Sequence, residues 1–179
     1  MVRDKKIDSD PGCCPPLERR DFLYVVQCAP LVSIDLVVRN GSGQVLVGLR
    51  KNEPCQGLWF VPGGCIRKNE TIRAAFSRIA QDELGKGITQ EQARFLGVYE
   101  HFYPQNFAQE PGFGTHYVVL AHEVLLKGDP EINPDPQHDQ YRWLSPDALL
   151  ADPGVHENTK AYFRPAFTRT IISKASLLE

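Results

Sequence analysis

The sequence lacks the marks of a membrane protein and of a nucleic-acid-binding protein. No apolar run approaches the roughly 20 residues that a helix needs to span a bilayer. The polar stretch at residues 1–12 carries charges but not the apolar core of a signal peptide. The net charge is only −2, so no basic field attracts DNA or RNA. We therefore expect no membrane or nucleic-acid partner, and a cytoplasmic location.

The cysteines are few and have no regular spacing. There are five of them: Cys13, Cys14, Cys28, Cys55 and Cys65. An odd count without paired spacings argues against a disulfide framework. Neither C-x-x-C nor H-E-x-x-H occurs, so a structural or catalytic zinc site has little support.

What the chain does contain suits a single α/β domain. Its 179 residues, 42% of them hydrophobic, are enough for one domain with a sizeable core. We expect residues 1–16 to form a disordered leader and residues 17–179 to form one folded domain. Strands are predicted at residues 31–39, 44–50, 58–61, 95–103, 115–126 and 141–144, and helices at residues 71–84, 145–151 and 156–163. Strands that enclose one helix and end in others indicate an α/β sandwich.

Two connections in this pattern have distinctive compositions. Residues 40–43, with the sequence NGSG, separate the first two strands and predict a hairpin turn. Residues 104–114 are rich in glycine, proline and aromatic side chains, which is typical of an active-site loop.

The helix at residues 71–84 carries a carboxylate on its apolar face. At about 100° per residue, four apolar side chains share one face: Ile72, Ala75, Phe76 and Ile79. Glu83 falls at the centre of the same face. A carboxylate there is costly unless it is paired or binds a metal, so Glu83 is a candidate metal ligand. The alternative is that Glu83 lies at a frayed helix end and points to water.

Three other charged residues near this helix have simple explanations. Glu70 suits the first turn, where the helix dipole favours an acid. Arg78 and Asp82 are four residues apart, and a surface ion pair explains them almost as well as a function does.

The spacing of these residues resembles the Nudix box, a Gly-x5-Glu-x7-Arg-Glu pattern that ends in further acids and a glycine. The matching residues are Gly64, Glu70, Arg78, Asp82, Glu83 and Gly85. Ile79 replaces the first glutamate of the acid cluster, and Asp82 replaces the second by a shorter acid. Ordinary Nudix enzymes use this cluster to hold several magnesium ions and to cleave a pyrophosphate P–O bond. Ile79 leaves the cluster one acid short.

Other blocks of the sequence are similar to a divergent Nudix branch, the GDP-mannose mannosyl hydrolases. The similarity runs from about Leu17 to Phe163 and includes QGLWFVPGG, AAFSRIAQDELG, HFYPQNF and QHDQYRWLSPDALL. It implies a Nudix-fold α/β/α sandwich with a mixed β-sheet. It also implies hydrolysis of GDP-mannose, and to a lesser degree GDP-glucose, to GDP and free sugar. The attack is at the sugar carbon, with inversion.

The resemblance assigns a metal and a base to particular residues. A single Mg²⁺ is held by Glu83, by the side-chain oxygen of Gln137 and by the main-chain carbonyl of Gly63. An all-oxygen set of ligands suits magnesium. His138, next to Gln137, is the expected general base, since its ordinary pKa of about 6.5 suits proton transfer near neutrality.

The resemblance also assigns residues to the substrate. Arg50 and Arg78 neutralise the leaving diphosphate. Asp35 lies near the sugar and phosphate, although a buried structural acid is an equal alternative. His101 and Tyr117 contact the substrate, although Tyr117 also suits a core position.

The N-terminal part of the expected domain and one substitution also bear on the substrate. In the family the N-terminal segment contributes to a homodimer and to the nucleotide site, and the resemblance implies the same for the segment from Leu17 to Phe22 here. Cys65 stands where the family has an arginine that carries leaving-group charge.

Three other functions stay open at this point. A P–O-cleaving Nudix pyrophosphatase could use Asp82 with Glu83. A catalytically weak nucleotide-sugar sensor is favoured by Cys65. The base His138 opposes the sensor, because a sensor needs none. A structural or interaction protein is supported by nothing specific.

Overall fold

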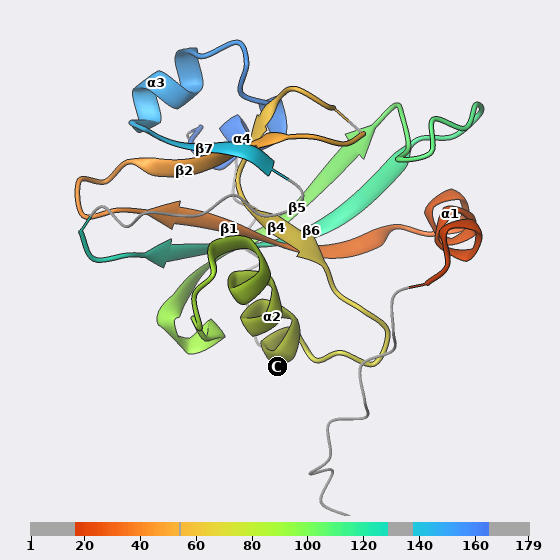
Figure 1. Cartoon of the computed structure of the whole chain (residues 1–179), viewed down its shortest axis with the longest axis horizontal. Helices are drawn as coiled ribbons and strands as arrows, with labels where there is room; N and C mark the ends of the chain where they lie inside the picture. Colours follow the sequence, from red (N-terminus) through yellow and green to blue (C-terminus); the bar gives the residue numbers. More distant parts are fainter. Residues whose placement is uncertain (1–16, 54, 129–137, 165–179) are drawn as a thin grey trace, which may run out of the picture.

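The computed structural model describes residues 17–53, 55–128 and 138–164 (Figure 1). The leader expected at residues 1–16 lies outside these ranges, as does Gln137. None of the helices in the described ranges has the length and apolar composition needed to cross a membrane.

A seven-stranded mixed sheet forms the centre of the molecule, in the order β3-β2-β1-β6-β5, with β4 paired to β1 and β7 paired to β2. The strands are β1 (Leu31–Arg39), β2 (Val45–Arg50), β3 (Trp59–Phe60), β4 (Gly63–Cys65), β5 (Ala93–Tyr103), β6 (Thr115–Leu125) and β7 (His138–Leu144). β1 pairs with β6 in parallel along the whole length of β1, whereas the other strand pairs are antiparallel.

Helices cover both faces of this sheet. In Figure 1, α2 (Ile72–Leu84) lies below the sheet, and α3 (Pro146–Ala151) and α4 (Glu157–Ala161) lie above it. Successive residues of a strand point to opposite faces, which divides β1 between two cores. Ile34, Leu36 and Val38 pack in the core that holds α2, and Val37 packs in the other with Leu149 of α3. The predicted α/β sandwich with a mixed sheet is confirmed.

The helix predicted at residues 71–84 has the ends that its sequence suggests. The Thr71 side chain accepts a hydrogen bond from the amide of Ala74 at 3.1 Å, and Gly85 ends the helix in a left-handed conformation with φ of 63°. Most of the predicted apolar face is buried, but Ile72 in the first turn is 44% exposed. The buried face of this helix is therefore shorter than the helical periodicity of the sequence predicted.

Three elements were not predicted: α1 (Arg19–Cys28), β4 and the short 3₁₀ helix η1 (Gln90–Gln92). No side-chain cap marks the start of α1, so the sequence carries no clear start signal for it. The double glycine predicted to end a strand instead forms β4, which pairs with β1 through main-chain atoms. The expected turn at residues 40–43 does join β1 to β2, and the Asn40 side chain accepts hydrogen bonds from Ser42 and Gln44.

The loop at residues 104–114 is organised by one buried side chain. The Asn106 amide donates to the carbonyls of Glu110 and Phe113, and its oxygen accepts from the amides of Ala108 and Glu110, at 2.8–3.1 Å. The next residue, Phe107, packs on Phe22 of α1 with ring centroids 5.1 Å apart. The loop is thus fixed internally and supports the helix that the sequence did not reveal.

We expect Asn106→Ala to lower the free energy of unfolding by about 3 kcal/mol, because four main-chain groups lose their partner. Denaturant unfolding measures the change, and Gln105→Ala, at an exposed neighbouring side chain, is the matched control. Equal losses from both variants would show that Asn106 does not organise the loop.

Candidate functional site

A pocket of about 950 Å³ opens between α1, β1, β4 and α2. It brings together nine of the eleven residues predicted for the site: Leu17, Phe22, Asp35, Arg50, Gly63, Arg78, Glu83, His101 and Tyr117. The other two are Gln137, which lies outside the described residues, and His138. The main chain of His138 pairs with Arg50 between β7 and β2.

The floor of the pocket depends on the close approach of two strands. Asp35 of β1 lies directly opposite Gly63 of β4. A Cβ atom on Gly63 would lie 2.6 Å from Asp35 Oδ1 and 2.7 Å from the Ile34 carbonyl oxygen, so only glycine fits there. Burial raises the pKa of Asp35 to about 6, although a hydrogen bond from Tyr162 and the charge of Arg50 both act to lower it.

His101 lines the pocket from β5 and is neutral near pH 7. Burial, together with the nearby His156, lowers the pKa of His101 to about 4. Its Nε2 lies 3.3 Å from the hydroxyl oxygen of Tyr162, which is 2.6 Å from Asp35 Oδ2. Tyr162 therefore links two pocket residues from separate strands, and no sequence pattern points to it.

Glu83 is buried in the last turn of α2, with 3% of its surface exposed. The alternative that it points to water from a frayed helix end is wrong. Among the described residues, no group of three histidine, cysteine, aspartate or glutamate side chains is arranged to hold a metal ion. Within the pocket, the Glu83 carboxylate and Gly63 are the predicted oxygen ligands, and such oxygens are the kind that Mg²⁺ prefers. The residues present thus fit a single hard cation better than a metal cluster.

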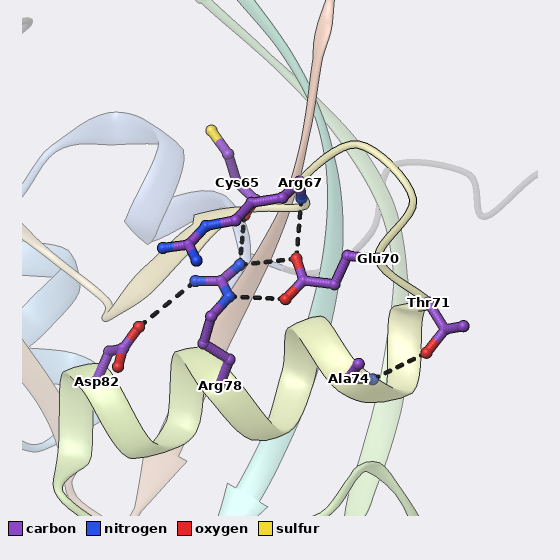
Figure 2. Close-up of polar contacts among 7 residues, drawn as sticks. All are labelled: Cys65, Arg67, Glu70, Thr71, Ala74, Arg78 and Asp82. Atoms are coloured by element: carbon purple, nitrogen blue, oxygen red, sulfur yellow. Dashed lines mark hydrogen bonds and ion pairs between the residues drawn. The ribbon is translucent and has the colours of Figure 1, made fainter. Parts of the chain in front are cut away.

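The Glu70 side chain forms an ion pair with Arg78, and the residue lies before the first turn of α2 instead of within it (Figure 2). It precedes the capping residue Thr71, and its almost fully buried carboxylate accepts hydrogen bonds from Arg78 Nε at 2.7 Å and Nη2 at 2.9 Å. The explanation of Glu70 by the helix dipole is therefore wrong. Long-range pairing across the loop takes its place, since the two residues are eight apart in sequence.

Arg78 has two further partners in the same view. Its Nη2 donates to the Cys65 carbonyl at 2.9 Å, and its Nη1 reaches Asp82 at 3.5 Å (Figure 2). The expected Arg78–Asp82 pair is present, but it is longer than the contacts with Glu70. Arg78 braces the loop at residues 65–70, and its role toward a leaving diphosphate stays a prediction.

Two basic residues of this loop also line the pocket. They are Arg67 and Lys68, and the charge of Arg67 also acts on Glu70, whose pKa it helps to lower. Arg50 lies with its guanidinium 5.5 Å from the centre of the Phe60 ring. The sequence shows Arg67 and Lys68 as a basic pair between a double glycine and a helix, which is the signal that could have identified them.

The remaining walls are aromatic and apolar. Tyr103 and Tyr117 meet edge to face with ring centroids 5.8 Å apart, and burial raises the pKa of both hydroxyls, that of Tyr103 to about 12. On the opposite side, Phe22 and Val25 of α1 contribute apolar surface. Such a combination of apolar walls with a few charged groups suits a ligand that has a ring and an anionic part.

The Glu70–Arg78 pair makes stability depend on pH. Arg78 holds the pKa of Glu70 below its ordinary value of 4.5, so the pair stabilises the fold above that pH and loses its effect as pH falls through the lowered pKa. We expect Glu70→Gln to cost about 3 kcal/mol at pH 7 and distinctly less at pH 3.5. Denaturant unfolding at both values tests this, with Glu110→Gln, at an exposed carboxylate, as the control. A cost that does not change with pH would contradict it.

Comparisons of the sequence with known proteins agree with the Nudix resemblance. The NUDIX domain model matches residues 29–166. The low-salt glycan biosynthesis protein Agl8 of Haloferax volcanii is 45% identical over 123 residues, which cover 68% of this chain and 75% of that protein.

Solved structures agree on the fold. The MutT NUDIX hydrolase of Burkholderia pseudomallei has a TM-score of 0.59 at 25% identity, covering 75% of this chain and 95% of that one. A bifunctional NMN adenylyltransferase/ADP ribose pyrophosphatase of Francisella tularensis, complexed with AMP and a Mn ion, has a TM-score of 0.52 at 22% identity. It covers 81% of this chain and 40% of that one, and at this identity it shows the fold alone. The chain belongs to the NUDIX domain family.

Proposed function

We propose that this protein hydrolyses a GDP-sugar, GDP-mannose foremost, to GDP and the free sugar. The family supports Nudix hydrolase activity, and the observation that carries the finer proposal is Ile79. Its side chain is 1% exposed in the core of α2 and lies against Gly64, at the position where the Nudix box has its first clustered acid. The protein therefore has fewer acids at this position than an enzyme that holds several metal ions.

A shortage of acids suits cleavage of a C–O bond better than cleavage of a P–O bond. Attack at phosphorus needs a strongly activated water, and hence a dense group of metals and carboxylates. Attack at an anomeric carbon passes through an oxocarbenium-like state and expels a diphosphate, which is already a good leaving group. The glycan-related name of the Haloferax volcanii relative agrees with a sugar-containing substrate.

We infer that a divalent cation, Mg²⁺, binds between the Glu83 carboxylate and the Gly63 carbonyl, with Gln137 as the third ligand. Nudix hydrolases generally use divalent metals, and both described residues line the pocket. When bound, the cation neutralises charge that develops on the diphosphate. Arg50 supports this with a fixed positive charge, and Arg67 and Lys68 add two more at the same pocket.

The reaction needs one base and one leaving group. His138 accepts a proton from water, the water oxygen bonds to the anomeric carbon, and the C–O bond to the β-phosphate breaks on the opposite side. Its electron pair leaves with GDP. The main-chain pairing of His138 with Arg50 supports this division of roles, because it joins the proposed base to the strand that carries a phosphate-binding arginine.

The substrate assembly follows from the same pocket. We assign the nucleotide end to the wall that Leu17 and Phe22 form, and the sugar and phosphates to the side of Asp35, His101 and Tyr117. The homodimer expected from the resemblance stays a prediction.

One observation favours the P–O-cleaving alternative. Asp82 is 56% exposed along its side chain and lines the pocket beside Glu83, where it is available as a second acid. The observation that favours the sensor alternative is Cys65. Burial raises the pKa of its thiol to about 11, so a neutral group stands where the family has a positively charged arginine.

Hydrolysis of GDP-mannose in water enriched in heavy oxygen tests the proposal directly. We expect unlabelled GDP and labelled mannose, released first as the anomer opposite to that of the substrate, because attack at carbon leaves both phosphates on the nucleotide. Mass spectrometry and proton NMR measure the two properties. GMP and mannose 1-phosphate, with label in a phosphate, would instead establish the pyrophosphatase. Binding without turnover of any GDP-sugar would establish the sensor.

Two variants distinguish hydrolysis at carbon, which needs Glu83 alone, from the pyrophosphatase, which uses Asp82 with Glu83. We expect Glu83→Gln to lower kcat by at least about 100-fold, because it removes the proposed metal ligand, whereas Asp82→Asn keeps most of the activity. Mg²⁺ titration by calorimetry provides a second measurement, in which only Glu83→Gln weakens binding. Equal losses in the two variants would contradict the single-ligand assignment.

A further inference from the structure

Tyr162 connects two strands through the back of the pocket. It caps the C-terminal end of α4, and its hydroxyl lies 2.6 Å from Asp35 Oδ2 on β1 and 3.3 Å from His101 Nε2 on β5. Its ring also meets Tyr99 edge to face, with centroids 4.8 Å apart. Asp35 and His101 both line the pocket, whereas Tyr162 stands behind them.

The two distances determine which way the hydroxyl proton points. A tyrosine hydroxyl has one proton, so it donates to only one of its two partners. A separation of 2.6 Å lies in the range of about 2.5–2.7 Å that is typical of a hydroxyl donating to a carboxylate. The proton therefore goes to Asp35, and the Tyr162 oxygen is left to accept from His101.

We propose that Tyr162 is a positioning residue that holds His101 in the tautomer with its proton on Nε2 and holds the Asp35 carboxylate in place. The burial that keeps His101 neutral near pH 7 supports this, because a neutral ring carries one proton and must place it on one nitrogen. His101 then accepts hydrogen bonds only through Nδ1. Tyr162 occupies Oδ2 of Asp35, so Oδ1, which packs against Gly63, is the carboxylate oxygen left to accept other hydrogen bonds.

The consequence for the reaction rests on the proposed function. A substrate hydroxyl that meets His101 must donate to Nδ1, so the tautomer decides which sugar orientation the pocket accepts. The tautomer itself does not depend on the identity of the substrate. The two parts of the proposal can therefore fail separately.

Two other histidines, the buried His122 and the half-buried His156, provide internal references. His122 Nδ1 lies 3.1 Å from the Leu120 carbonyl oxygen, so its proton is on Nδ1. His156 Nδ1 accepts from the amide of Asn158 at 3.1 Å, so its proton is on Nε2. Burial lowers the pKa of both rings, which keeps them neutral at the pH of the measurement. The hydrogen bonds that set these two tautomers go to main-chain atoms and not to Tyr162, so both rings should be unaffected by its hydroxyl.

Nitrogen NMR of the full chain at pH 7.5 tests the assignment. Long-range proton–nitrogen spectra distinguish the two tautomers of each ring, and His101→Gln identifies the His101 signals. Tyr162→Phe removes the hydroxyl and keeps the ring. Tyr99→Phe, in the ring that packs on Tyr162, is the matched control. Unchanged His122 signals in each variant show that the fold is intact.

In the wild-type protein and in Tyr99→Phe we expect His101 to be protonated on Nε2. In Tyr162→Phe we expect a measurable fraction of His101 to move to the Nδ1 tautomer, because Nε2 loses the oxygen to which it donates. A wild-type His101 protonated on Nδ1 would overturn the proposal even if Tyr162→Phe fails to fold. An unchanged tautomer in a folded Tyr162→Phe would overturn it as well.

Steady-state kinetics with GDP-mannose test the catalytic consequence. We expect Tyr162→Phe to lower kcat by roughly 10- to 100-fold, with KM within about 2-fold, because misplaced groups slow a reaction more than they weaken ground-state binding. Tyr99→Phe should keep wild-type values. Equal kinetics for the two variants would overturn this consequence. A wild-type protein that turns over no GDP-sugar would instead refute the proposed function and leave the NMR result standing.

Discussion

The pocket depends on the contact between one guanidinium and the loop in front of it. Arg78 projects from the middle of α2 and binds the Glu70 carboxylate through two nitrogens and the Cys65 carbonyl through one of them. A bidentate pair of this kind fixes orientation as well as distance. It joins the loop that carries Arg67 and Lys68 to the helix that carries Glu83. Cationic and acidic groups of the pocket thus keep a fixed relation to one another.

Much of the fold could be predicted because its signals are local. Alternating and continuous apolar runs gave the central strands, and Thr71 with Gly85 marked the ends of α2. α1 was missed because no capping side chain marks its start, and β4 because its pairing with β1 uses main-chain atoms that any residue has.

The residues of the site also differ in whether a local sequence signal identifies them. Glu83 was found because an acid on an apolar stripe stands out in the sequence, and the structure buries it. The partner of Glu70 was not found, because the contact crosses a loop and does not follow helical spacing. Tyr162 was beyond reach, since 127 residues separate it from Asp35 and nothing local distinguishes it from a core tyrosine. Pairings across the fold are what sequence patterns omit.

The parallel pairing of β1 with β6 has a consequence for how the chain folds. Each residue of β1 has a partner 86 residues later, as Leu31 does in Tyr117, so the centre of the sheet cannot form from neighbouring segments. Closing such long loops costs entropy before any contact repays it, and it slows folding. During synthesis, β1 therefore cannot pair with β6 until β6 has left the ribosome. Asp35 meets Tyr162 later still, because Tyr162 follows all seven strands in the sequence, so this contact forms only after every strand of the sheet has been synthesised.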